Sequence, residues 1–136
     1  MNKLVTSSIA IALFLLAGCA ASGPKLASSA EDIVGTWQST TDSVPGLQFN
    51  EDGTAFGDPA SVSPTPGEFR FEGTRLFLVN IAPGDDCVLL GAETGIYEVE
   101  LLENGNLKFT LIEDDCLFRV SYQVGRVIEV EFEPVP

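Results

Sequence analysis

The chain has 136 residues and a formal net charge of −13, with 20 acidic side chains, 7 basic side chains and no histidine. This length fits one domain. The negative charge repels nucleic acid and anionic lipid headgroups, so neither is expected as a partner. The absence of histidine removes the usual general base, the common partner of nucleophilic serine and cysteine, and the commonest zinc ligand. We therefore expect no enzymatic activity.

Residues 1–18 have the pattern of a secretory signal peptide. Lys3 supplies a positive charge, Ile9 to Ala17 form an apolar core, and small residues precede Cys19. The apolar stretch is too short and wrongly flanked for a membrane-spanning helix. The leader therefore predicts export from the cytoplasm.

The sequence Leu16-Ala17-Gly18-Cys19 resembles the lipobox of bacterial lipoproteins, which is a leucine, two small residues and a cysteine. The resemblance implies that Cys19 becomes the mature N-terminus, is acylated, and anchors the chain to a membrane. The alternative is an ordinary signal peptide with an incidental cysteine. With Ala20 after the cysteine, the expected location in the cell envelope is the outer membrane in a host with two membranes, and otherwise the outer face of the cell membrane.

Residues 19–32 are predicted to form the lipidated N-terminus and a flexible tether, because they are small and polar and include Gly23-Pro24. The folded domain is expected over residues 33–136. Once Cys19 carries lipid outside the cytoplasm, Cys87 and Cys116 remain as one disulfide pair. The alternative is two buried free thiols.

From Ile33 onward, short β-rich runs alternate with Gly, Pro, Asn and Asp, and no helical period is sustained. The pattern predicts an all-β domain: an antiparallel up-and-down meander of about eight or nine strands. Closing the meander into a small barrel would remove its two open edges. Residues 58–66 contain three prolines and are not expected inside a strand. Residues 82–94 are expected to form a longer loop around Cys87.

The hairpin between the cysteines can be predicted in register. A three-residue loop, Glu103-Asn104-Gly105, places glycine at the left-handed position and keeps the apolar faces together. It pairs Leu101 with Leu107, Val99 with Phe109, Tyr97 with Leu111, and Glu100 with Lys108.

Three further hairpins follow from the same reasoning about alternating side chains. Their turns are expected at Asn50 to Gly53, at Gly73-Thr74 and near Gly125. The first joins 47–49 to 54–56, the second sets Phe69 and Phe71 opposite Leu78 and Leu76, and the third sets Phe118, Val120 and Tyr122 against Ile128, Val130 and Phe132.

Gly35-Thr36-Trp37 resembles the Gly-x-Trp signature of the lipocalin and fatty-acid-binding proteins, and residues 47–54 resemble a hairpin of small lipocalin-like lipoproteins. The resemblance implies a barrel that holds a small apolar ligand, with Trp37 closing its bottom beneath a basic residue of the last strand. Here the last strand carries acidic residues, so only Arg119 or Arg126 of the preceding segment could substitute. The alternative for Trp37 is ordinary core packing.

Two functions of different classes are compatible with such a barrel. In the first, a lipid-anchored carrier or sensor binds a small hydrophobic ligand in a cavity. In the second, side chains fill the barrel and an adaptor binds an envelope protein through its outer face, where Phe56 and Phe77 are expected. The residues predicted to line a cavity are Trp37, Phe49, Phe69, Phe71, Tyr97, Phe109 and Tyr122.

The tripeptide Asp-Asp-Cys occurs twice, ending at Cys87 and at Cys116. A disulfide would gather Asp85, Asp86, Asp114 and Asp115 at one end of the barrel. Such a group of carboxylates suggests a Ca²⁺ site, and the alternative is a solvated acidic rim. No other cofactor is expected.

Overall fold

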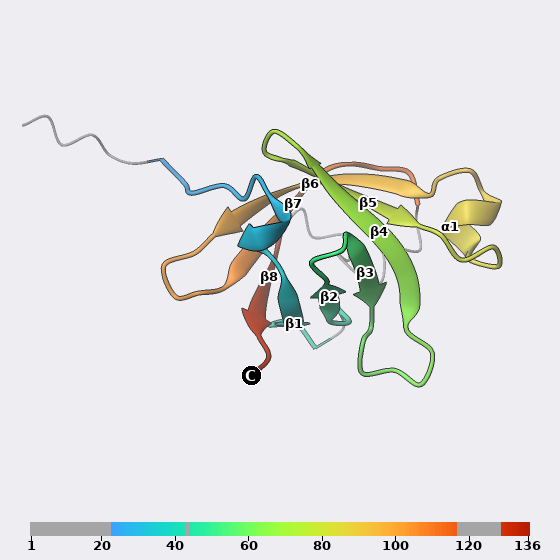
Figure 1. The fold of residues 1–136 in the computed structure, drawn as a ribbon, viewed down its shortest axis with the longest axis horizontal. Helices are drawn as coiled ribbons and strands as arrows, with labels where there is room; N and C mark the ends of the chain where they lie inside the picture. The colour runs from blue at the N-terminus through green and yellow to red at the C-terminus, as the bar shows by residue number, and fades with distance from the viewer. Residues whose placement is uncertain (1–22, 43, 117–128) are drawn as a thin grey trace, which may run out of the picture.

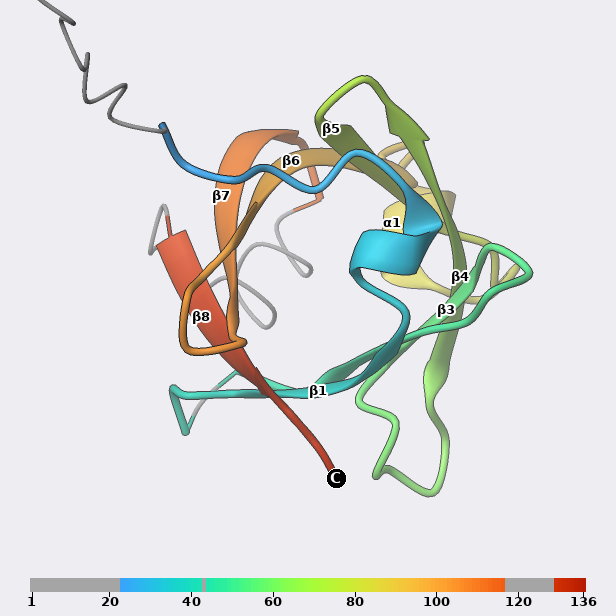
Figure 2. The ribbon, with the colours of Figure 1, turned by 60° about the vertical axis from the view of Figure 1, so that its left-hand side comes forward.

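Eight antiparallel strands follow one another around a closed barrel in the order β1 to β8 in the computed structural model, which describes residues 23–42, 44–116 and 129–136. Figure 1 shows the barrel from the side, and Figure 2 shows it from one end. The predicted all-β meander and its closure are confirmed. In the described part of the chain, no helix is long and apolar enough to cross a membrane. The elements are η1 (Ala30–Asp32), β1 (Gly35–Ser39), β2 (Leu47–Phe49), β3 (Thr54–Gly57), β4 (Thr65–Glu72), β5 (Arg75–Asn80), α1 (Asp86–Leu89), β6 (Thr94–Leu101), β7 (Leu107–Asp114) and β8 (Glu129–Pro134).

The β6–β7 hairpin has the predicted register. Leu101 pairs with Leu107, Val99 with Phe109, and Tyr97 with Leu111. Gly105 has a φ of 87°, the left-handed conformation that the loop requires. On the outer face, the Lys108 ammonium forms an ion pair with Glu100, and this hydrogen bond raises the pKa of Lys108. Alternation and glycine placement were therefore enough to predict this hairpin.

The β2–β3 and β4–β5 hairpins also agree with the prediction. Phe69 pairs with Leu78 and Phe71 with Leu76, around a turn at Gly73. The prediction that residues 58–66 would lie outside the strands was wrong at its end, because β4 begins at Thr65 and includes Pro66. Pro66 is tolerated because it lies at the start of the strand, where the missing N–H costs little.

The last strand closes the barrel. In the described residues, β8 pairs with β7 through Phe109 and Val130, and with β1 through Ser39 and Phe132. Val130 and Phe132 face inward, as predicted, and are buried. The predicted partner strand of Phe118, Val120 and Tyr122, with Arg119 and Arg126, lies outside the described residues, as does the whole leader with Cys19.

The N-terminal strap, residues 25–33, packs on the barrel instead of forming part of a tether. The Ala27 N–H donates to the Val99 carbonyl at 2.8 Å, and the Leu101 N–H donates to the Lys25 carbonyl at 2.7 Å. Ala27 and Ile33 are fully buried. The boundary predicted at residue 33 was therefore wrong for residues 25–32, because a polar segment can still bury isolated apolar side chains.

The strap occupies an edge that the neighbouring strand leaves open. β5 pairs with β6 only as far as Arg75 and Glu98, so the end of β6 lacks a partner on that side. Leu26 bridges to Glu100 in this gap. In Figure 2 the strap crosses one mouth of the barrel and η1 lies over that mouth, while α1 lies beyond the other. The strap therefore caps both a strand edge and a barrel end.

Candidate functional site

Aromatic rings occupy the interior of the barrel. The Phe49 ring contacts the Phe69 ring edge-on, with centroids 5.0 Å apart, and stacks on Phe109 at 6.2 Å. Phe109 also meets Tyr97 and Phe132 edge-on, at 6.3 and 5.2 Å. These are favourable geometries for aromatic pairs.

The residues predicted to line a cavity are therefore brought together, but they contact one another. Phe49, Phe69, Tyr97 and Phe109 are buried in one core, and Phe71 and Trp37 are partly buried against it. Tyr122, the remaining predicted lining residue, lies outside the described part of the chain. In the described part, the side chains proposed to surround a ligand pack on one another in the barrel core.

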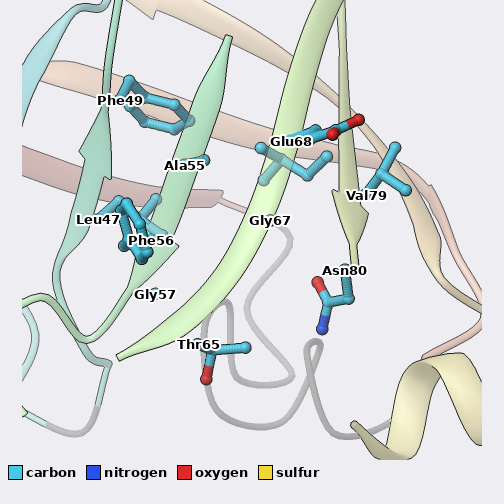
Figure 3. Close-up of a pocket in the computed structure, with 11 residues that line it drawn as sticks. Leu47, Phe49, Ala55, Phe56, Gly57, Thr65, Gly67, Glu68, Val79 and Asn80 are labelled. Carbon is cyan, nitrogen blue, oxygen red and sulfur yellow. The ribbon is translucent and has the colours of Figure 1, made fainter. Parts of the chain in front are cut away.

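In the described part of the chain, a pocket lies between β2, β3, β4 and β5, and buried core residues are among those that line it (Figure 3). Its volume is about 20 Å³, and Phe49, Ala55 and Gly67 are among its lining residues. This is roughly the space that one ordered water requires. The pocket is too small for an apolar ligand of the size that lipocalin-like barrels carry.

Trp37 lies at the barrel end that the strap covers. Its indole N–H donates to the Ile33 carbonyl at 2.8 Å. Ile33 is fully buried and packs in the same core. Trp37 therefore packs against the core and holds the Ile33 backbone at this end, while Arg119 and Arg126, the basic residues considered for closing the barrel above it, lie outside the described residues.

The predicted disulfide joins Cys87 and Cys116, with their Cα atoms 5.3 Å apart, inside the usual range for disulfides. Cys87 belongs to α1 and Cys116 follows β7, so the bond attaches the β5–β6 connection to the end of β7. Both cysteines are buried. In the chain-entropy model, closing a loop of this length stabilises the fold by about 3 to 4 kcal/mol.

The repeated tripeptide has a structural explanation. An Asp85 Oδ1 accepts the Cys87 N–H at 2.9 Å, and an Asp114 Oδ1 accepts the Cys116 N–H at 2.9 Å. In each copy the first aspartate therefore folds the backbone back on the cysteine two residues later. Asp85 is also the N-cap residue of α1 and accepts a hydrogen bond from Asn80.

No group of three or more acidic, cysteine or histidine side chains in the described residues is placed to hold a metal ion. The four aspartates that the sequence suggests as calcium ligands, Asp85, Asp86, Asp114 and Asp115, are all in this part of the chain. Asp85 and Asp114 instead accept hydrogen bonds from the chain itself, and Asp86 and Asp115 are exposed.

Tyr97 connects the aromatic core to the disulfide. Its side chain is 1% exposed, and its hydroxyl donates to Asp114 Oδ2. Gly95 leaves room for this pair, because an added Cβ would lie 2.8 Å from Tyr97 Cε2 and 2.9 Å from Asp114 Cγ. The sequence contained no local signal for this contact, since Gly95 is not at a turn and has an ordinary φ.

Phe56 and Phe77 lie on the outer face of the barrel but are not fully exposed there. Both side chains are partly buried, while their strand neighbours Ala55, Leu76 and Leu78 are buried, so the outward direction predicted for them holds. The Arg70 guanidinium lies over the Phe77 ring, 4.4 Å from its centroid. This contact covers part of the apolar surface that Phe77 would otherwise present.

A larger exposed apolar surface lies on α1, which was predicted as loop. Leu89 and Leu90, here called the leucine pair, are 68% and 67% exposed. The signal for the helix was Asp85 as N-cap residue and Gly91 after the last turn, where φ is 69°. A helix of one turn has too little periodicity to be recognised by pattern.

Comparisons with protein-family models, with curated proteins and with solved structures found no match. The lipobox and the Gly-x-Trp motif thus remain resemblances of short segments. What is shown is the closed eight-stranded antiparallel barrel, its buried aromatic core and its disulfide.

Proposed function

We propose that this chain is a non-enzymatic adaptor of the bacterial cell envelope. A lipid on Cys19 anchors it to the membrane, and the barrel is a filled scaffold that presents its outer surface to a protein partner. The observation that supports this choice over a carrier is the core itself, because the aromatic residues nominated to surround a ligand pack on one another.

The energetics of the interior agree with this assignment. Phe49, Phe109 and Phe132 are each at most 2% exposed. A ligand inside the barrel would have to displace such rings and break their mutual contacts. Displacing even one ring forfeits interactions comparable to those lost in a large-to-small core substitution, about 3–5 kcal/mol.

The anchor determines how the scaffold would be displayed. The chain from Cys19 to Lys25 is about six residues long and reaches at most about 20 Å when extended. Lys25 already bonds to the barrel through the strap. The strap end of the barrel would therefore face the bilayer, and α1, at the opposite end in Figure 1, would face away from it.

Ligand titration tests the filled barrel. We expect the full chain, titrated with the fluorescent fatty acid cis-parinaric acid, to show no saturable binding. Phe109→Ala should create an apolar cavity, lower the free energy of unfolding by about 3–5 kcal/mol, and allow benzene to bind.

Phe77→Ala is the matched control, because it removes the same ring from the outer face and leaves the interior filled. It should bind neither compound. Saturable binding of cis-parinaric acid to the unaltered chain, or apolar compounds recovered from it by organic extraction, would count against the adaptor and in favour of the carrier.

A further inference from the structure

We infer that the leucine pair on α1 is the docking site for a protein partner whose contact surface has an apolar centre and a basic rim. This inference rests on the proposed adaptor function and adds the location and chemistry of the contact. It starts from two adjacent leucines that are each about two-thirds exposed, at 68% and 67%.

Hydrogen bonds and the disulfide fix the backbone at the leucine pair. Leu89 N–H donates to the Asp85 carbonyl and Leu90 N–H to the Asp86 carbonyl, each at 3.0 Å. After the turn, the Ala92 N–H donates to the Cys87 carbonyl at 2.8 Å. Cys87 is buried and disulfide-bonded, so one side of α1 is attached to the barrel while the leucines project from it. A preorganised contact loses little entropy on binding.

The charge around the leucine pair indicates the partner. Four acidic residues are exposed on or near the parts of the chain that the disulfide joins: Asp86 on α1, Glu93 before β6, Glu113 near the end of β7 and Asp115 next to Cys116. The sequence has no lysine or arginine from residue 76 to residue 107. An apolar centre with an acidic rim is complementary to a surface with an apolar centre and a rim of lysine and arginine.

The same charges disfavour two other occupants. A second copy of the chain docking through its own leucine pair would bring two acidic rims together, because such a symmetric contact pairs each patch with itself. A bilayer with anionic headgroups would repel the rim. The strap, which continues toward the proposed anchor, also lies at the opposite end of the barrel from α1 (Figure 1).

The test uses the full chain and a short amphipathic helical peptide of leucine and lysine as the probe. We expect saturable binding that weakens with added salt. Leu89→Ser combined with Leu90→Ser should weaken it at least about tenfold. Val62→Ser is the matched control, because Val62 is an exposed apolar residue too but lies in the β3–β4 connection, and it should change the affinity less than about twofold.

A second set of variants keeps the test valid if the chain that combines Leu89→Ser and Leu90→Ser, here called the leucine variant, folds poorly. Asp86→Asn combined with Asp115→Asn should weaken binding of the peptide about threefold or more, while Asp42→Asn, an exposed aspartate before β2, should leave it unchanged. A control peptide with every leucine replaced by serine should bind weakly and equally to the unaltered chain and to the leucine variant.

The inference is overturned if the leucine variant binds the peptide with unaltered affinity. It is also overturned if sedimentation shows a dimer that the leucine variant abolishes, which would make a second copy the occupant, or if the leucine pair is needed for binding to phosphatidylcholine vesicles. These outcomes are separate from the ligand titration above, so failure of the docking site and failure of the filled barrel can be distinguished.

Discussion

Single carboxylates shape the backbone around the disulfide. Asp85 and Asp114 each accept the N–H of the cysteine two residues later. Asp114 also accepts the hydrogen bond from Tyr97, whose ring is in the aromatic core. Asp114 therefore links the aromatic core to the disulfide. If the buried Tyr97 hydroxyl lost this acceptor, the fold would be destabilised by more than the net contribution of one hydrogen bond, because a buried donor would be left without a partner.

Gly95 provides the test of this contact. Gly95→Ala should lower the free energy of unfolding by about 1–3 kcal/mol, because the new methyl group would overlap Asp114 and the Tyr97 ring and force them apart. The measurement is chemical denaturation of the oxidised chain.

Gly84→Ala is the matched control, because an added Cβ there has no atom within 4 Å. It should be neutral or slightly stabilising, since alanine restricts the unfolded chain more than glycine does. Equal stability of the two variants would show that the Tyr97–Asp114 contact does not depend on the absence of a side chain at Gly95.

Among the elements, the strap depends on one capping aspartate. Asp32 Oδ2 accepts the N–H groups of Ser28 and Ser29, at 2.9 and 3.1 Å. The hydrogen bond from the Ser28 backbone is the main cause that lowers the pKa of Asp32. These bonds begin η1, and η1 places Ile33 in the barrel end.

Lowering the pH should release the strap. Because the pKa of Asp32 is lower in the folded chain than in the unfolded chain, its contribution is complete above about pH 4 and is lost as the pH falls through the folded pKa. We expect the hydrogen-exchange protection of the Ala27 and Leu101 amides, whose hydrogen bonds join the strap to β6, to be lower at about pH 2.5 than at about pH 6.

The Asp32→Ala chain should show the lower protection already at about pH 6. Asp52→Ala is the control, because Asp52 also has a lowered pKa but caps the β2–β3 turn, through Thr54. It should leave the amides of Ala27 and Leu101 unchanged. If Asp32→Ala also left both amides fully protected, the strap would be held by its strand contacts alone.

For the whole molecule, the two ends of the barrel differ. The strap closes one end, and the disulfide-linked α1 with its leucine pair lies at the other (Figure 2). The net charge of −13 is expected to repel anionic headgroups. A lipid anchor would then be needed to keep it at a membrane, and attachment through residues 19–24 would direct the leucine pair outward.

Cys19→Ser tests the anchor. We expect the unaltered chain to incorporate labelled palmitate and to sediment with membranes, and the Cys19→Ser chain to do neither, because it lacks the acylated sulfur. Cys87→Ser is the matched control: it removes a cysteine of the disulfide and should keep both the label and the membrane association. Label on the Cys19→Ser chain would contradict lipidation at this residue.

Local patterns were sufficient for the hairpins. The register of β6 and β7 followed from the alternation of Tyr97, Val99 and Leu101 and from a glycine at the left-handed loop position. The disulfide pair followed from counting cysteines after the lipobox. These features depend on neighbouring residues or on covalent chemistry, so the sequence determined them by itself.

The tertiary structure decided the features that depend on distant contacts. Gln38 and Glu133, 95 residues apart, hydrogen-bond where β1 meets β8. Whether the inward rings would surround a cavity or fill the barrel depended on their packing across several strands. The strap could pair with β6 only because β5 ends its own pairing at Arg75 and Glu98. The leucine pair is exposed because the disulfide attaches the Cys87 side of α1 to the barrel. Alternation predicts which face a side chain takes, whereas only the assembled barrel determines what that face meets.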